Sequence, residues 1–397
     1  MSLRRRSEQQ EGNVEEPRTV DDLNPEYLSS VVRKLLDDDS VEVTDFSVTA
    51  DPFEFPRFGA KEFHDIAFNY RGQSGAGKSN LILRVMPEMD AVMMLTGDTE
   101  HRELKAFGIG LYDQIPKTFH TPYVDVILRP ERQQYWAFLE DLRPQMRALG
   151  MHAALPDETM RTILSHLAAF HAKFWEREET LSYPWLMSLR QPVDYFYRCV
   201  VDTLDGLKSP AASSAYIIDK WPWLPEGVVN LMNSLPTDTR AAIERLYREP
   251  EELLTRIEPL PTTLCHYDFD NRNLGIEDGP NGPRTVVIDW EILGVGLSSA
   301  DVVRFLSYQQ PPNAEELVGH YLAELQRSLG GSLDQEQWLY GFELVQIAVW
   351  QIVGVLFGVM VSAPSSPIPD EQRGPMGERA RSDIDHVMSL VRKHGLA

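Results

Sequence analysis

The sequence contains little cysteine and little positive charge. Its 397 residues include only two cysteines, Cys199 and Cys265. They are too few for a disulfide framework, and no Cys/His spacing indicates a zinc site. Lysine and arginine number 38 against 60 aspartate and glutamate residues, a formal net charge of −22. Because nucleic-acid surfaces need clustered basic residues, this balance argues against a nucleic-acid partner and is compatible with a cationic or neutral small substrate.

The beginning of the sequence has no apolar stretch typical of a secretory signal. Residues 1–24 are polar and charged and contain almost no large apolar side chains. We therefore expect a disordered N-terminal tail and no signal peptide. Together with the lack of a disulfide framework, this favours a cytoplasmic protein in a reducing environment.

Long apolar runs are also scarce, with one exception at residues 344–363. This segment is about as long as a bilayer span and carries no charged residue. However, Gln346 and Gln351 interrupt it, and no basic cluster flanks it immediately. We expect a helix buried on all sides in a large helical domain, and no membrane association.

The pattern of apolar residues changes from strand-like to helical along the chain. Short runs rich in β-branched and aromatic residues predict strands, then a helix-like stretch follows, then two more strands. From about residue 144 the spacing of apolar residues is helical, beginning with a helix that Asp157 can cap. The predicted strands cover 41–48, 63–70, 79–87, 124–130 and 133–141; the helical stretches cover 98–112, 157–174, 191–206, 236–257, 312–329 and 335–361.

Residues 72–79, GQSGAGKS, match the P-loop pattern G-x-x-x-x-G-K-[ST]. A P-loop follows a buried strand and opens a helix, whose N–H groups bind phosphate. Here the run after Lys78 is strand-like and ends at Pro87, and the run before it alternates like an antiparallel strand. We therefore interpret the segment as a glycine-rich hairpin turn.

The strongest chemical signal lies in residues 264–275, LCHYDFDNRNLG, followed by VVIDWE at 286–291. Phosphoryl transfer needs one carboxylate to orient and deprotonate an attacking hydroxyl, and oxygen ligands to hold Mg²⁺ against nucleotide phosphates. Asp268 lies between an apolar run and a polar loop and suits the first role as catalytic base. Asn273 and Asp289, the second at the end of an apolar strand, suit the metal.

These two segments resemble the catalytic and metal-binding loops of the aminoglycoside phosphotransferase and choline kinase-like superfamily. The shared pattern is H-x-D-x-x-x-x-N, then an apolar strand ending in Asp, then a glycine-containing run and a further aspartate, here Asp301. The early β-rich region, LILRVMP and LAAFHAKFW look most like the ecdysteroid kinase-like branch. Within this resemblance we expect His266 to be structural and Asp301 to order the loop.

The resemblance implies an α+β protein kinase-like bilobal fold with a small β-rich N-lobe and a large, mostly helical C-lobe. We place the N-lobe at residues 25–142 and the C-lobe at 143–397. The implied activity is that of an ATP- and Mg²⁺-dependent kinase, a monomer or homodimer, that phosphorylates a hydroxyl of a small metabolite or antibiotic. The alternative is a catalytically weak or inactive nucleotide-binding protein of the same fold.

The resemblance also implies nucleotide-binding residues in the N-lobe. Arg84 occupies the position of the family's phosphate-binding lysine, and Glu103, or else Glu100, is its expected partner. Arginine can also bind phosphate, but its planar head is not interchangeable with an ammonium group. AFLEDL at 137–142, including Glu140 and Leu142, resembles the hinge that binds adenine, whereas residues 52–63 lack a tidy glycine-rich phosphate loop.

Substrate identity stays open at this stage. Asp270 and Glu291 lie beside the predicted catalytic residues in the sequence and could attract a cationic substrate. They could equally be solvated neighbours with no contact to substrate.

Overall fold

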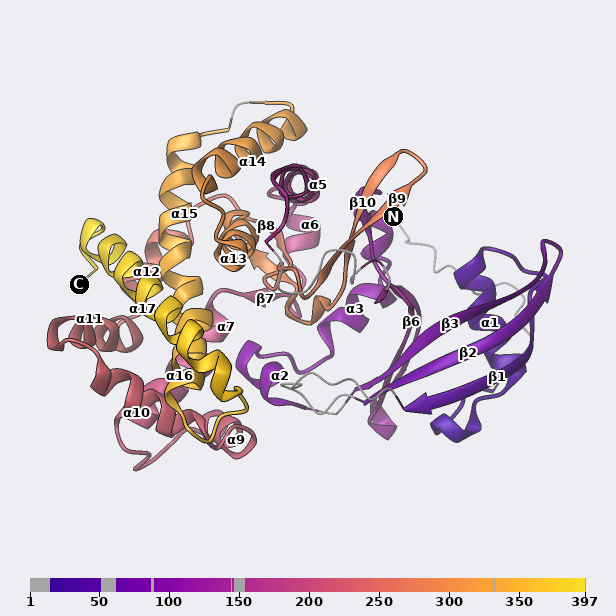
Figure 1. Cartoon of the computed structure of the whole chain (residues 1–397), viewed down its shortest axis with the longest axis horizontal. Helices are drawn as coiled ribbons and strands as arrows, with labels where there is room; N and C mark the ends of the chain where they lie inside the picture. The colour runs from indigo at the N-terminus through magenta and orange to yellow at the C-terminus, as the bar shows by residue number, and fades with distance from the viewer. Residues whose placement is uncertain are drawn as a thin grey trace. The chain divides into compact units, whose positions relative to one another are not determined.

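The computed structural model describes residues 15–50, 62–86, 89–143, 145, 154–331 and 333–396. The chain forms two compact units (Figure 1). We call Met1–Glu88 with Pro122–Leu142 the sheet unit, and Met89–Thr121 with Arg143–Ala397 the helical unit. The predicted α+β class, with a small β-rich part and a large helical part, is confirmed.

The sheet unit is built on one antiparallel five-stranded sheet in the order β1-β2-β3-β6-β5. Helix α1 begins after Asn24, whose side chain accepts a hydrogen bond from Tyr27 N at 2.9 Å. The helix packs its apolar face, including Leu28 and Val31, on Ile66 and other buried sheet residues. The elements are η1 (Val20–Asp22), α1 (Pro25–Leu36), β1 (Glu42–Ala50), β2 (Glu62–Gly72), β3 (Gly75–Met86), β5 (Tyr123–Arg129), η3 (Pro130–Arg132) and β6 (Gln134–Glu140).

The segment before α1 differs from the expected disordered tail. Leu23 is buried in the core of the sheet unit. Backbone carbonyls of the segment also accept hydrogen bonds from strand side chains, at 2.9 Å from Arg129 Nη1 and 2.6 Å from Gln134 Nε2. Residues 15–24 therefore pack on the sheet because an apolar side chain and paired carbonyls hold them there. Residues 1–14 lie outside the described part of the chain.

The P-loop-like segment is a hairpin between β2 and β3. Gly72 pairs with Gly75 across a two-residue turn, and Gly75 has φ of 112°, which only glycine adopts without strain. Lys78 lies within β3, paired with Asn69, and the strand continues to Met86. Lys78 is therefore followed by strand and not by the helix that a P-loop opens, so the hairpin interpretation is confirmed.

The helical unit contains long helices and two small three-stranded sheets, β4-β10-β9 and β7-β11-β8. Its N-terminal part comprises α2 (Ala91–Thr96), α3 (Arg102–Gly108), η2 (Tyr112–Gln114) and β4 (Phe119–His120). The elements before the candidate site are α5 (Asp157–Phe174), α6 (Glu178–Leu181), β7 (Met187–Ser188), α7 (Arg190–Pro192), the π-helical η4 (Val193–Tyr197), α8 (Arg198–Leu204), α9 (Ala212–Lys220), α10 (Leu224–Ser234), α11 (Thr237–Arg248) and α12 (Glu251–Ile257).

The remaining elements of the helical unit carry and follow the candidate site. They are β8 (Thr263–Cys265), β9 (Leu274–Gly279), β10 (Gly282–Val287), η5 (Trp290–Ile292), β11 (Gly294–Gly296), α13 (Ser299–Gln309), α14 (Ala314–Leu329), α15 (Gln335–Val349), the π-helical η6 (Trp350–Gly354), α16 (Val355–Ser362) and α17 (Asp370–Lys393).

Residues 89–121 group with the helical unit, whereas the predicted domain boundary placed them in the N-lobe. The cause is visible in α3. The buried guanidinium of Arg102 donates hydrogen bonds to three backbone carbonyls, those of Trp185 at 2.7 Å, Glu291 at 3.0 Å and Thr96 at 3.2 Å. These contacts join α3 to distant segments of the helical unit, and no local sequence pattern encodes them.

The apolar segment forms the continuous helical stretch α15, η6 and α16. By length and composition alone, Gln335–Ser362 could cross a membrane, but 59% of its most apolar window is buried within the protein. Gln351 lies inside and contacts two tyrosines: Tyr197 donates to its side chain and Tyr247 to its carbonyl, each at 2.5 Å. The stretch is therefore packed among the helices, although it is not buried on all sides as expected.

The packing of α16 on α10 can be tested at Gly227. A Cβ atom at this position would overlap the carbonyl oxygen of Val359. We expect Gly227→Ala to lower the free energy of unfolding by about 1–3 kcal/mol through overpacking, measured by urea denaturation. The matched control is Gly319→Ala, on an exposed part of α14 with open space around it, which should be neutral or stabilising. Equal stability of the two variants would contradict the close packing.

Candidate active site

The predicted catalytic loop, residues 266–273, connects two short strands of the helical unit. β8 enters it and pairs with β11, while β9 leaves it and pairs with β10. The backbone of Ile288 donates a hydrogen bond to Asn273 O at 3.0 Å. Both ends of the loop are thus anchored, and the end of the loop lies beside the segment that carries Asp289.

Asp301, on α13, binds the beginning of the loop. Its two carboxylate oxygens accept hydrogen bonds from His266 N at 2.8 Å and from Tyr267 N at 2.6 Å. Tyr267 has a φ of 65°, a left-handed conformation that is unfavourable for such a residue and that these bonds stabilise. The prediction that Asp301 orders the loop is confirmed.

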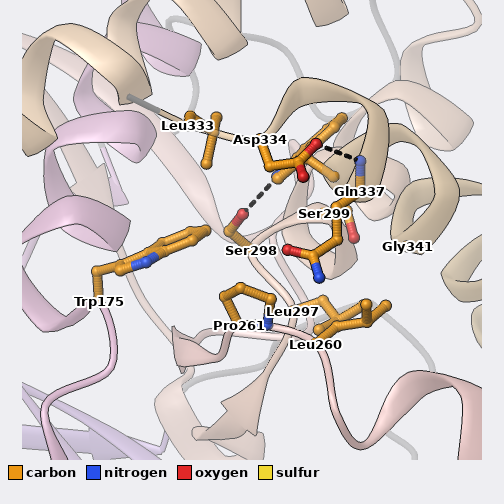
Figure 2. A pocket seen from close by; sticks show the side chains of 11 residues that line it. Trp175, Leu260, Pro261, Leu297, Ser298, Ser299, Leu333, Asp334, Gln337 and Gly341 are labelled. Atoms are coloured by element: carbon orange, nitrogen blue, oxygen red, sulfur yellow. Dashed lines mark hydrogen bonds between the residues drawn. The ribbon is translucent and has the colours of Figure 1, made fainter. Parts of the chain in front are cut away.

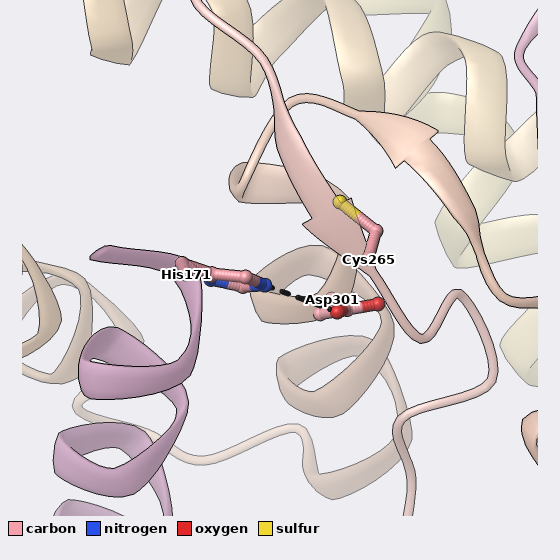
Figure 3. A group of neighbouring side chains, drawn as sticks. All are labelled: His171, Cys265 and Asp301. Atoms are coloured by element: carbon pink, nitrogen blue, oxygen red, sulfur yellow. Dashed lines mark hydrogen bonds and ion pairs between the residues drawn. The ribbon is translucent and has the colours of Figure 1, made fainter. Parts of the chain in front are cut away.

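His171, on α5, supports Asp301 from the other side. Its Nε2 lies 3.1 Å from Asp301 Oδ2, and its Nδ1 lies 2.6 Å from the hydroxyl of Tyr321. Figure 3 shows the ring of His171 pointing toward Asp301, with Cys265 on the neighbouring strand. These three side chains are close enough to share a metal ion. However, burial and then the charge of Asp301 raise the pKa of the Cys265 thiol, and the other two groups are already hydrogen-bonded, so we interpret the cluster as support for the loop.

His266 also has a structural position. Its ring is buried, with Nε2 2.9 Å from the carbonyl oxygen of Ile288, and it packs edge-on against Trp290 with the ring centroids 4.7 Å apart. The contact links the first residue of the loop to the strand end before Asp289. The predicted structural role of His266 is confirmed.

The structure brings two of the predicted active-site residues into direct contact. Asn273 Nδ2 donates hydrogen bonds to Asp268 Oδ2 at 2.8 Å and to Asp268 O at 2.9 Å. Two acceptors on its nitrogen fix the orientation of the amide and turn Asn273 Oδ1 away from Asp268. Asp289 follows β10 by two residues with φ of 62° and is one residue from Ile288, whose N–H binds Asn273. Amide and carboxylate oxygens of this kind fit Mg²⁺.

Two arginines that the sequence did not indicate also contact Asp268. Arg272 Nη2 lies 2.9 Å from Asp268 Oδ1, and Arg304, from α13, donates to the same oxygen from Nε at 3.1 Å and Nη2 at 2.8 Å. Burial alone would raise the pKa of Asp268, but the two guanidinium groups outweigh it and lower the pKa of this carboxyl well below its usual range. For Arg272, a possible signal was its position four residues after Asp268, whereas Arg304 had no local signal.

The same arginines bind Asp270, which is fully buried. The suggestion that Asp270 attracts a cationic substrate is therefore wrong, because its charge is enclosed and neutralised. For Glu291, the hydrogen bond from Arg102 involves its backbone carbonyl and does not place its carboxylate in a substrate site.

The predicted phosphate-binding pair involves residues of different units. Arg84 is buried on β3 of the sheet unit, and its Nη2 lies 3.4 Å from the hydroxyl of Tyr123. Glu103 is fully buried on α3 of the helical unit, and its carbonyl accepts a hydrogen bond from Tyr112 at 3.0 Å. Their pairing stays a prediction.

The predicted hinge lies at the end of β6. Glu140 pairs with Leu81 of β3, and its N–H donates to Pro122 O at 2.8 Å. Leu142 follows and is buried. The adenine contacts of this segment stay a prediction, and most of the 52–63 loop lies outside the described residues, which omit 51–61.

A small pocket lies elsewhere in the helical unit, under the beginning of α13 (Figure 2). Trp175, Leu260 and Ser299 are among its lining residues, together with Trp338, whose indole N–H donates to Ser298 Oγ at 2.8 Å. Its volume of about 20 Å³ suits roughly one water molecule. It is too small to be the acceptor site.

Comparison with known proteins finds one family match and similar solved structures. Residues 200–339, which include the catalytic loop, Asp289 and Arg304, match the phosphotransferase enzyme family, APH. The fold is similar to that of an ethanolamine kinase of Plasmodium vivax, with a TM-score of 0.50, 14% identity, and coverage of 88% of this chain and 83% of that one. It is also similar to a microcompartment-associated aminopropanol kinase, with a TM-score of 0.51, 12% identity, and coverage of 88% and 94%.

No curated protein sequence matches this chain. The predicted resemblance to the aminoglycoside phosphotransferase and choline kinase-like superfamily is confirmed, and so is the kinase-like bilobal fold. Residues 200–339 are thus similar to a phosphotransferase family, and the chain shares the fold of the two solved structures.

The role of Asp301 can be tested without knowing the substrate. In Asp301→Asn one of the two loop N–H groups loses its acceptor, which costs about 1–3 kcal/mol. We expect hydrogen exchange at the amides of His266 and Tyr267 to accelerate roughly tenfold or more. The control is Asp202→Asn on α8, since Asp202 is also buried and accepts a hydrogen bond from a backbone amide, Ala211 N, at 2.9 Å. Unchanged protection of the two loop amides in Asp301→Asn would contradict the assignment.

Proposed function

We propose that the protein is a cytoplasmic, ATP- and Mg²⁺-dependent kinase that transfers the γ-phosphate to a hydroxyl group of a small molecule. The observation that carries the proposal is the contact between Asn273 Nδ2 and Asp268 Oδ2, which leaves the amide oxygen of Asn273 for a metal. One loop then holds a hydroxyl-binding carboxylate next to a metal ligand, the arrangement that phosphoryl transfer requires.

In this proposal Asp268 holds the acceptor hydroxyl in line with the γ-phosphate and takes its proton. Two guanidinium groups contact the carboxylate and weaken it as a base. This is compatible with a loose transition state, in which the attacking oxygen needs orientation more than early deprotonation. The main contribution of Asp268 is then the placement of the hydroxyl, and proton acceptance comes late.

Asn273 and Asp289 would hold Mg²⁺ through an amide and a carboxylate oxygen. When bound, the ion neutralises charge on the β- and γ-phosphates. The hydrogen bond from Ile288 N to Asn273 O keeps the two ligand-bearing segments together before any metal arrives. In the sheet unit, Arg84 would bind phosphate with Glu103 as its partner, and the segment with Glu140 and Leu142 would bind the adenine.

The acceptor class is a small hydroxylated molecule. Two of the similar structures are an ethanolamine kinase and an aminopropanol kinase, which supports a small alcohol as acceptor. The enclosed charge of Asp270 removes one reason to expect a cationic acceptor. The alternative, a nucleotide-binding protein with weak or no turnover, is favoured by Arg84 at the lysine position, and the experiment below decides between the two.

Three single variants separate the proposed roles. We expect Asp268→Ala to lower phosphoryl transfer by at least about 100-fold, because it removes the hydroxyl-orienting group. It should retain nucleotide binding, because Asp289 stays and Asn273 Nδ2 keeps the backbone carbonyl of residue 268 as an acceptor. Asp289→Ala should abolish Mg²⁺-dependent ATP binding, because it removes the charged metal ligand. Lys78→Ala, in the β2–β3 hairpin, is the control and should bind ATP as the unaltered protein does.

Binding is measured by calorimetry with and without Mg²⁺. Turnover is measured as ATP consumption across a panel of hydroxylated metabolites that first shift the melting temperature in the presence of Mg²⁺ and ATP. Loss of binding in Lys78→Ala but not in Asp289→Ala would contradict the site. Tight ATP binding with neither phosphorylation of any acceptor nor hydrolysis of ATP would favour the non-catalytic alternative.

A further inference from the structure

We propose that Arg304 and the buried Asp270, together with Arg272, are positioning residues that leave only Oδ2 of Asp268 to take the acceptor hydroxyl. This inference rests on the proposed function. It assigns different roles to the two carboxylate oxygens of Asp268, and it adds Arg304, Asp270 and Arg272 to the proposed site.

Oδ1 of Asp268 is saturated. It accepts three N–H groups, one from Arg272 at 2.9 Å and two from Arg304 at 2.8 and 3.1 Å. A carboxylate offers about two lone-pair positions on each oxygen. No position on Oδ1 is therefore left for a substrate hydroxyl.

Oδ2 has the opposite surroundings. Its one hydrogen bond comes from Asn273 Nδ2 at 2.8 Å, and no second donor to it is found among the residues that the structure describes. One lone-pair position is therefore open. A hydroxyl bound there lies next to Asn273, so the atom that receives the phosphate is held beside the proposed metal ligand.

Asp270 fixes the two arginines. Its Oδ1 accepts the backbone N–H and the Nε–H of Arg272, each at 3.0 Å. Its Oδ2 accepts a hydrogen bond from Nη2 of Arg272 at 2.7 Å and forms an ion pair with Nη2 of Arg304 at 2.6 Å. All of its acceptor positions are used, and none of its surface is exposed. An enclosed carboxylate of this kind needs cationic partners, so it holds both guanidinium groups in one place.

Exposure differs across the group in a way that fits this assignment. Asp270 is completely buried and the side chain of Arg304 is 7% exposed, whereas those of Asp268 and Arg272 are 25% and 30% exposed. The inner pair is inaccessible to substrate and can act only through Asp268. The two aspartates and two arginines are also neutral as a set, so the positioning adds no net charge next to the acceptor.

The test compares Arg304→Gln, Arg304→Lys and the double variant Arg304→Gln/Asp270→Asn. The single Gln variant leaves Asp270 with fewer cationic partners and so lowers stability, whereas the double variant removes both charges together. The control is Arg373→Gln on α17, since Arg373 likewise makes several hydrogen bonds, but to the backbone carbonyls of Met360, Val361 and Ala363 rather than to the loop. Mg²⁺-dependent ATP hydrolysis, with water as acceptor, is the activity probe, and stability is followed by urea denaturation.

We expect both Arg304→Gln and the double variant to lower kcat by about 10- to 100-fold with KM for ATP within about twofold, because only the hydroxyl-holding group is misplaced. Arg304→Lys should recover part of kcat, since an ammonium keeps the charge but loses the fork. Arg373→Gln should lose stability without loss of kcat. The proposal would be overturned if kcat fell no more than in the control. It would also be overturned if KM for ATP rose by the same factor as kcat fell.

A second readout does not depend on turnover. In a crystal structure of the double variant we expect the Asp268 carboxylate to rotate, with loss of the single contact between Oδ2 and Asn273. An unchanged carboxylate would overturn the positioning role, whatever the activity. If the unaltered protein neither hydrolyses ATP nor phosphorylates any acceptor, the proposed function fails, while this structure still decides whether Arg304 and Asp270 position Asp268.

Discussion

The site depends on the carboxylate of Asp301 and the two backbone N–H groups that it accepts. It holds Tyr267 in a left-handed conformation and so sets the direction in which the next residue, Asp268, leaves the backbone. His171 pairs with Asp301 from α5, and His266 joins the same loop to the carbonyl before Asp289. The packing of α5 and α13 against the loop therefore positions the carboxylate of Asp268.

A second constraint is electrostatic. The chain carries a formal net charge of −22, yet the carboxylate proposed to meet the acceptor lies between two guanidinium groups. With Asp270 enclosed among them, the group is neutral as a set, and the open acceptor position lies on Oδ2, the oxygen that binds Asn273. The proposed chemistry thus relies on orientation in a site prepared before substrate arrives, which suits a reaction with a loose transition state.

The spacing of residues in the sequence predicted much of the candidate loop and of the β2–β3 hairpin. Asp268 and Asn273 lie on one short loop, so their contact follows from a turn of a few residues, and the alternating runs around Gly72 and Gly75 predicted the hairpin. Arg304 reaches Asp268 from 36 residues away, which depends on how α13 packs and has no local signal. The sequence also misplaced residues 89–121 for this reason, because their grouping with the helical unit depends on long-range contacts of Arg102.

The most direct test of the central claim is a crystal structure of the full chain with a non-hydrolysable ATP analogue and Mn²⁺ in place of Mg²⁺. The anomalous signal of Mn²⁺ locates the ion without reference to the expected ligands. The account predicts an ion within about 2.2 Å of Asn273 Oδ1 and of an Asp289 carboxylate oxygen, in contact with the phosphates. An ion and nucleotide bound at the hairpin of residues 72–79, or no ion near these two residues, would contradict it.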